Sequence, residues 1–200
     1  MYEYTDAIIR YLEKKNIRAF RKLKNLLTYD EQNVLMTVNR MYSDIDQQTR
    51  DAFRRLADYM YKKYGGSDVP GLSDIWVDKI LDAYDPVVKY VYSHEVERKA
   101  ARLSESILAS NTKSKEIETA LRYWTVQMRE FAVRITDEAV SQALIDSGEE
   151  EARWITEKDE RVCKVCEARD GKIYPLSRFP SKPHIGCRCR RERIRQNDKS

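Results

Sequence analysis

Apolar residues recur at steps of three and four along most of the first 145 residues, a spacing that predicts amphipathic helices. One or two short helices are expected over residues 1–27, with Asn16 as a break. Thr28 stands three residues before Glu31, the spacing of a capping box, and predicts the start of a longer helix that stops at Gly65. The apolar positions of this longer helix are Val34, Leu35, Val38, Met41, Tyr42, Ile45, Phe53, Leu56 and Met60.

Turn and cap residues divide the rest of the helical part. They predict a loop over 65–71, a short helix capped by Ser73, a helix from Asp85-Pro86 to about Ser110, a turn over 111–114 and a long helix over 115–145. Ser147-Gly148 ends the last helix, because glycine readily takes the left-handed conformation at a helix C-terminus.

The pattern changes after Gly148, where short β-like runs replace helical periodicity. The runs cover residues 153–156 and 172–175, and Asp170-Gly171 before the second is a turn signal of the hairpin kind. A small, irregular C-terminal module is therefore expected after the helices.

Composition fits a folded, charged, helical protein. The 200 residues are 42% hydrophobic and 35% charged, with a net charge of +4. From Arg153 onward there are 14 Lys/Arg against 7 Asp/Glu, so the C-terminal part is the basic one. No apolar run approaches the roughly 18 residues needed to span a bilayer. The start, Met1-Tyr2-Glu3-Tyr4, lacks the features of a signal peptide, so we expect synthesis in a cytoplasm and no membrane partner.

All four cysteines lie within 27 residues, and the preceding 162 residues contain none. Cys163 and Cys166 are separated by two residues, which lets both thiolates of a knuckle bind one metal ion. His184, Cys187 and Cys189 follow after about 20 residues, a loop length found between the ligand pairs of zinc ribbons. The spacing predicts one structural Zn²⁺ that folds the module.

Five candidate ligands compete for the four positions of such a site. Cys163 and Cys166 form the first pair. For the second we favour His184 with Cys187, because a three-residue step folds round one ion more easily than the alternating Cys187 and Cys189. Disulfides or a redox-active pair are the competing interpretation, which a cytoplasmic location and the second Cys/His cluster disfavour. Four protein ligands leave no open position for water, so no catalysis at the metal is expected.

These patterns together predict a mainly α fold, an elongated arrangement of antiparallel helices with a small zinc-stabilised α+β module at the C-terminus. The expected parts are a helical region (1–110), a long helix (111–148), a zinc-binding module (149–190) and a basic tail (191–200).

Five separated elements of the last third occur in a recognisable order. They are Trp154-Ile155-Thr156; Asp159 and Arg161 ahead of Cys163 and Cys166; Asp170-Gly171 with Tyr174-Pro175; Pro183-His184; and Cys187-Arg188-Cys189. Together they resemble the phage Mu protein F-like head-morphogenesis domain, found in minor capsid proteins of tailed bacteriophages and often encoded beside the portal gene. The resemblance covers roughly residues 120 to 190. This chain has Ile185-Gly186 where the family has Pro-Asn, a departure that affects the loop and not the candidate ligands.

The resemblance implies a minor structural protein of a phage head, without enzymatic activity. Such a protein is made in the host cytoplasm and enters the assembling procapsid through contact with the portal, scaffold or major capsid protein. Several copies per particle are expected in the virion. They would support head morphogenesis and lie near the packaged DNA or leave with it at ejection.

The arginine-rich end suggests an alternative function, a nucleic-acid-binding zinc protein that acts as a regulator. Phosphates or an acidic partner could bind a set of five arginines: Arg188, Arg190, Arg191, Arg193 and Arg195. Enzyme signals are weak. His94-Glu95 begins like a metalloprotease motif, but Arg98 replaces the second histidine, and two histidines in the chain are too few for a nuclease of the HNH type.

Overall fold

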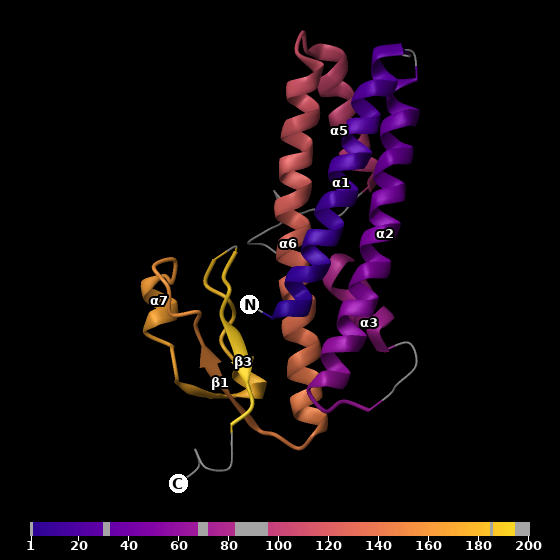
Figure 1. Cartoon of the computed structure of the whole chain (residues 1–200). Coiled ribbons are helices and arrows are strands. Elements are labelled where there is room, and N and C mark those ends of the chain that lie inside the picture. The colour runs from indigo at the N-terminus through magenta and orange to yellow at the C-terminus, as the bar shows by residue number, and fades with distance from the viewer. Residues whose placement is uncertain (1, 30–32, 68–71, 83–95, 185, 195–200) are drawn as a thin grey trace.

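The computed structural model describes residues 2–29, 33–67, 72–82, 96–184 and 186–194. An elongated helical bundle carries a small module beside its lower half (Figure 1). The described bundle helices are α1 (Glu3–Tyr29), α2 (Val34–Lys63), α3 (Leu72–Asp82), α5 (Val96–Ala109) and α6 (Lys113–Asp146). The prediction of a mainly α protein with a small C-terminal sheet is confirmed.

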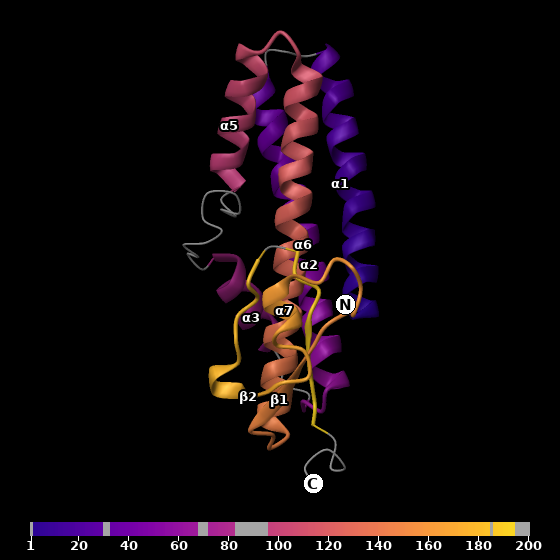
Figure 2. The ribbon, with the colours of Figure 1, turned by 90° about the vertical axis from the view of Figure 1, so that its left-hand side faces the viewer.

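Helices α2 and α6 contact each other and form the centre of the bundle. Helix α1 packs against both on one side, and α3 and α5 pack against both on the other. Helix α3 occupies the lower part of that side and α5 the upper part (Figures 1 and 2). Consecutive long helices run in opposite directions, as expected from the short connections between them. No helix within the described ranges is both long and apolar enough to cross a lipid bilayer.

Two apolar clusters fill the bundle, one in each half. The lower cluster contains fully buried side chains of α1, α2 and α6, among them Leu12, Phe53 and Leu144. In the upper cluster, the Tyr42 ring lies 5.8 Å from Phe20 and 5.4 Å from Trp124, measured between ring centroids. Spacings of three and four place these residues on the inner faces of their helices, which explains why periodicity predicted the helices well.

Three predicted boundaries were wrong. Asn16 does not break the first helix, because it lies buried within a continuous α1. Thr28 is not an N-cap, since α1 continues to Tyr29 and Asn33 precedes α2. The buried stripe of α1 extends to Leu27, and its burial outweighs the capping preference of the next residue. Ser73 lies inside α3 instead of ahead of it. The predicted start at Asp85-Pro86 and the signal at His94-Glu95 fall outside the described residues.

The C-terminal module is a three-stranded antiparallel sheet with a short helix. It comprises β1 (Glu151–Ile155), α7 (Lys164–Glu167), β2 (Ile173–Pro175), a 3-10 turn (Leu176–Arg178) and β3 (Arg190–Glu192), and the strand order is β2-β1-β3. The register pairs Ala152 with Tyr174 and Trp154 with Arg191. The sequence did not predict β3, because its three charged residues show no apolar alternation. This strand also extends the module two residues beyond the expected boundary at residue 190.

Helix α6 is covered on two sides, by the bundle and by the module. Ala152 of β1 and Leu176 join the lower apolar cluster. The hydroxyl of Tyr2, just ahead of α1, donates a hydrogen bond of 3.0 Å to the carbonyl oxygen of Arg191 in β3. The module is thus attached to the bundle by both apolar and polar contacts.

Candidate metal centre

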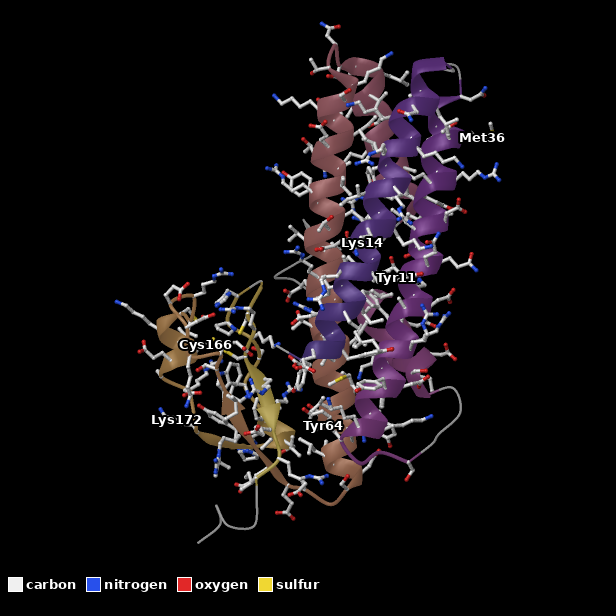
Figure 3. All side chains as sticks on the ribbon, viewed as in Figure 1. Tyr11, Lys14, Met36, Tyr64, Cys166 and Lys172 are labelled. Carbon is white, nitrogen blue, oxygen red and sulfur yellow. The ribbon has the colours of Figure 1, made fainter. Side chains whose placement is uncertain are left out.

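Five metal-binding side chains converge inside the module. The donor atoms of Cys163, Cys166 and His184 lie within 4.8 Å of one another, and so do those of Cys166, Cys187 and Cys189. Cys166 belongs to both groups and lies in the interior of the module (Figure 3). Its Sγ atom is 3.5 Å from that of Cys187. The structure therefore brings together all five ligands predicted from the sequence. His184 and Cys187, the favoured second pair, belong to different groups, and Cys166 is the member that the two groups share.

Local backbone geometry positions each pair of donors. Cys163 precedes the short helix α7, and its sulfur accepts a hydrogen bond of 3.4 Å from the backbone N–H of Cys166. In the second segment, the Cys187 N–H donates to the His184 carbonyl oxygen at 3.4 Å and closes a turn. Gly186 adopts a φ of +76° in this turn, a conformation that side chains with a Cβ rarely take. Each turn directs its donors toward the same small volume.

Burial and hydrogen bonding differ among the donors, and together they shift the pKa values of three of the thiols. Cys166, Cys187 and Cys189 are buried, Cys163 is half-buried and His184 is exposed. Burial raises the pKa of the Cys166 and Cys187 thiols, because the charged thiolate loses its hydration. The pKa of Cys163 is lowered to about 7, chiefly by the hydrogen bond from the Cys166 N–H and further by His184. All four thiols are free of disulfides.

A metal ion that prefers thiolate ligands fits this arrangement. A tetrahedral ion with sulfurs at about 2.3 Å holds them about 3.8 Å apart, close to the 3.5 Å between Cys166 and Cys187. A cavity of about 20 Å³ lies among the donors, room for a single small ion. Its lining residues are Glu157, Arg161, Val162, Cys163, Cys166, His184, Gly186, Cys187, Arg188 and Cys189.

Two ion pairs tie the ligand-bearing segments together. The Arg188 guanidinium donates to both carboxylate oxygens of Asp159, at 2.5 and 2.7 Å. Arg190 pairs with Glu157 at 3.2 Å. The bond from Arg188 lowers the pKa of Asp159, and the carboxylate in turn raises the pKa of Arg188. These pairs join the loop before Cys163 to the second ligand segment at Arg188 and to the start of β3 at Arg190.

The remaining arginines of the predicted phosphate-binding set also have partners within the chain. Arg191 donates to the carbonyl oxygen of Asp137 at 2.6 Å and to the Ser141 hydroxyl, and its guanidinium lies 4.7 Å from the Phe179 ring centroid. Arg193 pairs with Glu149 at 3.3 Å and donates to the Tyr64 carbonyl oxygen. Arg195 lies outside the described residues. The four described arginines therefore hold the module together and attach it to the bundle.

Two buried carboxylates of α6 contact the loop that carries His184 and Cys187. Glu130 Oε2 accepts the Gly186 N–H at 3.2 Å, and Asp137 pairs with Lys182 at 3.0 Å. Neither residue was among those predicted from the sequence. They lie seven residues apart, two helical turns, among the apolar positions of a helix whose apolar residues spread around much of its circumference. Charged residues in such a place are a signal of a second packed face.

An aromatic layer covers the cysteines on the sheet side. The Trp154 ring stacks on Phe179 at 5.7 Å with an interplanar angle of 12°, and the Arg169 guanidinium lies 5.0 Å from the Trp154 ring centroid. Trp154 and the three buried cysteines form the module's own apolar cluster, with Phe179 and Tyr174 packed against it. This core is small, so the module needs another source of stability.

The donors surround a small cavity, an arrangement that suits a metal ion with a structural role. Comparison of the chain with protein-family models, curated proteins and solved structures finds no match. The donor chemistry and the contacts around it therefore carry the functional assignment.

Proposed function

We propose that the module folds around one structural zinc ion. Sulfur and imidazole donors in a closed cluster favour Zn²⁺ over the oxygen-seeking ions Mg²⁺ and Ca²⁺. Cys163 and Cys166 supply two ligands, and two of His184, Cys187 and Cys189 supply the others. When bound, the ion neutralises buried thiolates and links β1 and β3 through segments that share few apolar contacts.

We further propose that the chain is a minor structural protein of a tailed-phage head that acts in head morphogenesis. The main support for this proposal is that the five separated motif elements lie together in one module. Among them, Asp159 pairs with Arg188, and Trp154 packs on the cysteine cluster. Gly186 has a left-handed conformation that asparagine, the family's residue there, adopts more readily than most others.

The alternative, a regulator that binds nucleic acid through the arginine-rich end, has less support. Arg188, Arg190, Arg191 and Arg193 each contact an acidic or carbonyl oxygen of this chain. A guanidinium engaged in this way must break an internal contact before it binds a phosphate. A bundle docked on a metal-folded module is better suited to an assembly role.

Metal analysis of the purified protein tests the zinc proposal. We expect one zinc per chain, and we expect Cys166→Ser to lose it while most helical circular dichroism remains. The module contributes only α7, four residues, to the described helix. Half-buried Ser106→Ala on α5, remote from the cluster, is the control and should retain zinc. A wild-type protein without zinc whose melting is unchanged by chelation contradicts the proposal.

Co-assembly tests the head proposal. The chain is produced together with the portal, scaffold and major capsid proteins that the proposal expects to be encoded beside it, and the particles are separated on a density gradient. We expect the chain to sediment with procapsids or with isolated portal. If it stays at the top of the gradient while particles form normally with and without it, the proposal is wrong.

A further inference from the structure

Five cationic side chains form a row on the outer face of α1. We call Arg10, Lys14, Arg18, Arg21 and Lys22 the α1 basic row, and all five are exposed. Their steps of four, four, three and one keep them on one side of a helix with 3.6 residues per turn. At 1.5 Å per residue the row is about 18 Å long. Tyr11 and Lys14 lie on the side of α1 that faces away from the rest of the bundle (Figure 3).

Nothing in the described part of the chain neutralises this row. None of its five members forms an ion pair or hydrogen bond with another described residue. The acidic Glu13 of α1 is turned to Arg129 on α6, and Lys24, beyond the end of the row, pairs with Glu118 at 3.8 Å. The other acidic residues of α1, Glu3 and Asp6, lie before the row begins. Unlike the C-terminal arginines, these cations are available to an external partner.

The chemistry of the row favours a polyphosphate over other anionic partners. An amphipathic membrane helix inserts an apolar face, but the apolar face of α1 is buried in both bundle clusters. The cores of protein interfaces are depleted of charge, whereas this row has five charges and few apolar neighbours, chiefly Tyr11 and Ile17. Phosphates of a duplex form a regular line of negative charge, which a straight row of Arg and Lys matches.

We propose that the α1 basic row binds the phosphate backbone of double-stranded DNA without sequence preference. Backbone contacts position a protein on a duplex and carry no base information. The inference rests on charge and exposure alone. It needs neither the zinc ion nor the role in head assembly.

The salt dependence of binding follows from the number of cations. Neutralising five phosphates gives a slope of about −4.5 for log K against log salt concentration. Raising the salt fourfold, from 50 to 200 mM, should therefore weaken binding about 500-fold. The loss of two contacts should reduce the slope to about −2.7 and weaken binding at least about 30-fold at 100 mM salt.

Fluorescence anisotropy with two labelled 30-base-pair duplexes of unrelated sequence measures these quantities. The test variant is Lys14→Glu with Arg18→Glu. Its control is Lys164→Glu with Lys172→Glu, which makes the same charge change at exposed lysines of the module. We expect the control to bind like the wild type, with equal affinity for both duplexes. Circular dichroism should show both variants folded, since all four positions are exposed.

The inference is overturned if the test variant binds as the wild type does or if the control weakens equally. It is also overturned if one duplex is strongly preferred, or if polyglutamate or anionic vesicles displace the protein at equal charge concentration. The two proposals fail separately. A test variant that loses DNA but still sediments with procapsids supports the inference, and wild-type protein that binds DNA but never enters particles refutes only the head role.

Discussion

The ion pair between Asp137 of α6 and Lys182 of the module offers a quantitative test of docking. The atoms are 3.0 Å apart, and the two side chains are 11% and 15% exposed. At an effective dielectric constant of about 20, the direct attraction is about 5 kcal/mol. Desolvation and remaining contact with water offset much of it. We therefore expect a coupling free energy of about 2 kcal/mol between the two side chains.

A double-mutant cycle isolates this coupling. Asp137→Asn, Lys182→Met and the double variant are compared with the wild type by urea unfolding of the zinc-loaded protein. The Arg191 hydrogen bond goes to the backbone carbonyl oxygen of residue 137, which this substitution does not remove. Circular dichroism and tryptophan fluorescence must give coincident transitions for the free energies to be valid.

A second pair at the same interface provides the matched comparison. Arg193 and Glu149 are 3.3 Å apart but 46% and 21% exposed, so their coupling should stay below about 1 kcal/mol. The reasoning is refuted if the Asp137–Lys182 coupling is below about 0.5 kcal/mol, or if the exposed pair couples as strongly. Either result would mean that burial does not strengthen the docking contact.

Three further predictions concern single residues. In metal-free protein whose module keeps its native fold, Cys163 should be alkylated first among the cysteines, with a half-maximal rate near pH 7, because its pKa is lowered to about 7 while burial raises that of Cys187; mass spectrometry that finds Cys187 modified first contradicts this. Burial raises the pKa of Tyr42 above its usual value of 10.0, so the native state favours the neutral phenol. The free energy of unfolding should therefore fall as the pH rises above about 10, and fall less in Tyr42→Phe; urea titrations at pH 8 and 10.5 that give equal losses for both proteins argue against it. Gly186→Ala should cost about 1 kcal/mol through its φ of +76° alone, since no atom lies within 4 Å of an added Cβ, and Gly186→Asn should cost less; equal thermal shifts for the two variants would oppose this account.

The sequence predicted the helices where apolar spacing is uninterrupted. The long helix expected over 115–145 is α6, Lys113–Asp146, because the apolar positions that predicted it, such as Trp124, Met128 and Phe131, recur at helical steps and are buried. The capping signal at Thr28 misled, since burial of Leu27 stabilises another turn of helix. Strand β3 could not be predicted from periodicity. Arg190–Glu192 forms a strand because it pairs with β1, and its side chains show no apolar alternation.

The five candidate metal ligands were predictable from the sequence, but the residues that hold their segments in place were not. The close spacing of Cys163 and Cys166 indicates a local turn, and such local features can be predicted from the sequence alone. The bond from Arg188 to Asp159 joins residues 29 apart, and that from Gly186 to Glu130 joins residues 56 apart. Such partners follow from the tertiary fold, in which many acidic residues are equally available to a given cation. The basic row of α1 was likewise overlooked, because charge counts cannot show which cations are already paired.

The two-sided burial of α6 has a consequence for biosynthesis. Every bundle helix precedes the first cysteine ligand in the chain, so a ribosome delivers α6 before the segment that will cover its second face. During that interval this face is in contact with water and with other nascent chains. Charged residues on an exposed apolar face oppose aggregation, and Glu130 and Asp137 place two negative charges on this face. The same two carboxylates later receive Gly186 and Lys182, so protection during synthesis and docking after it depend on the same groups.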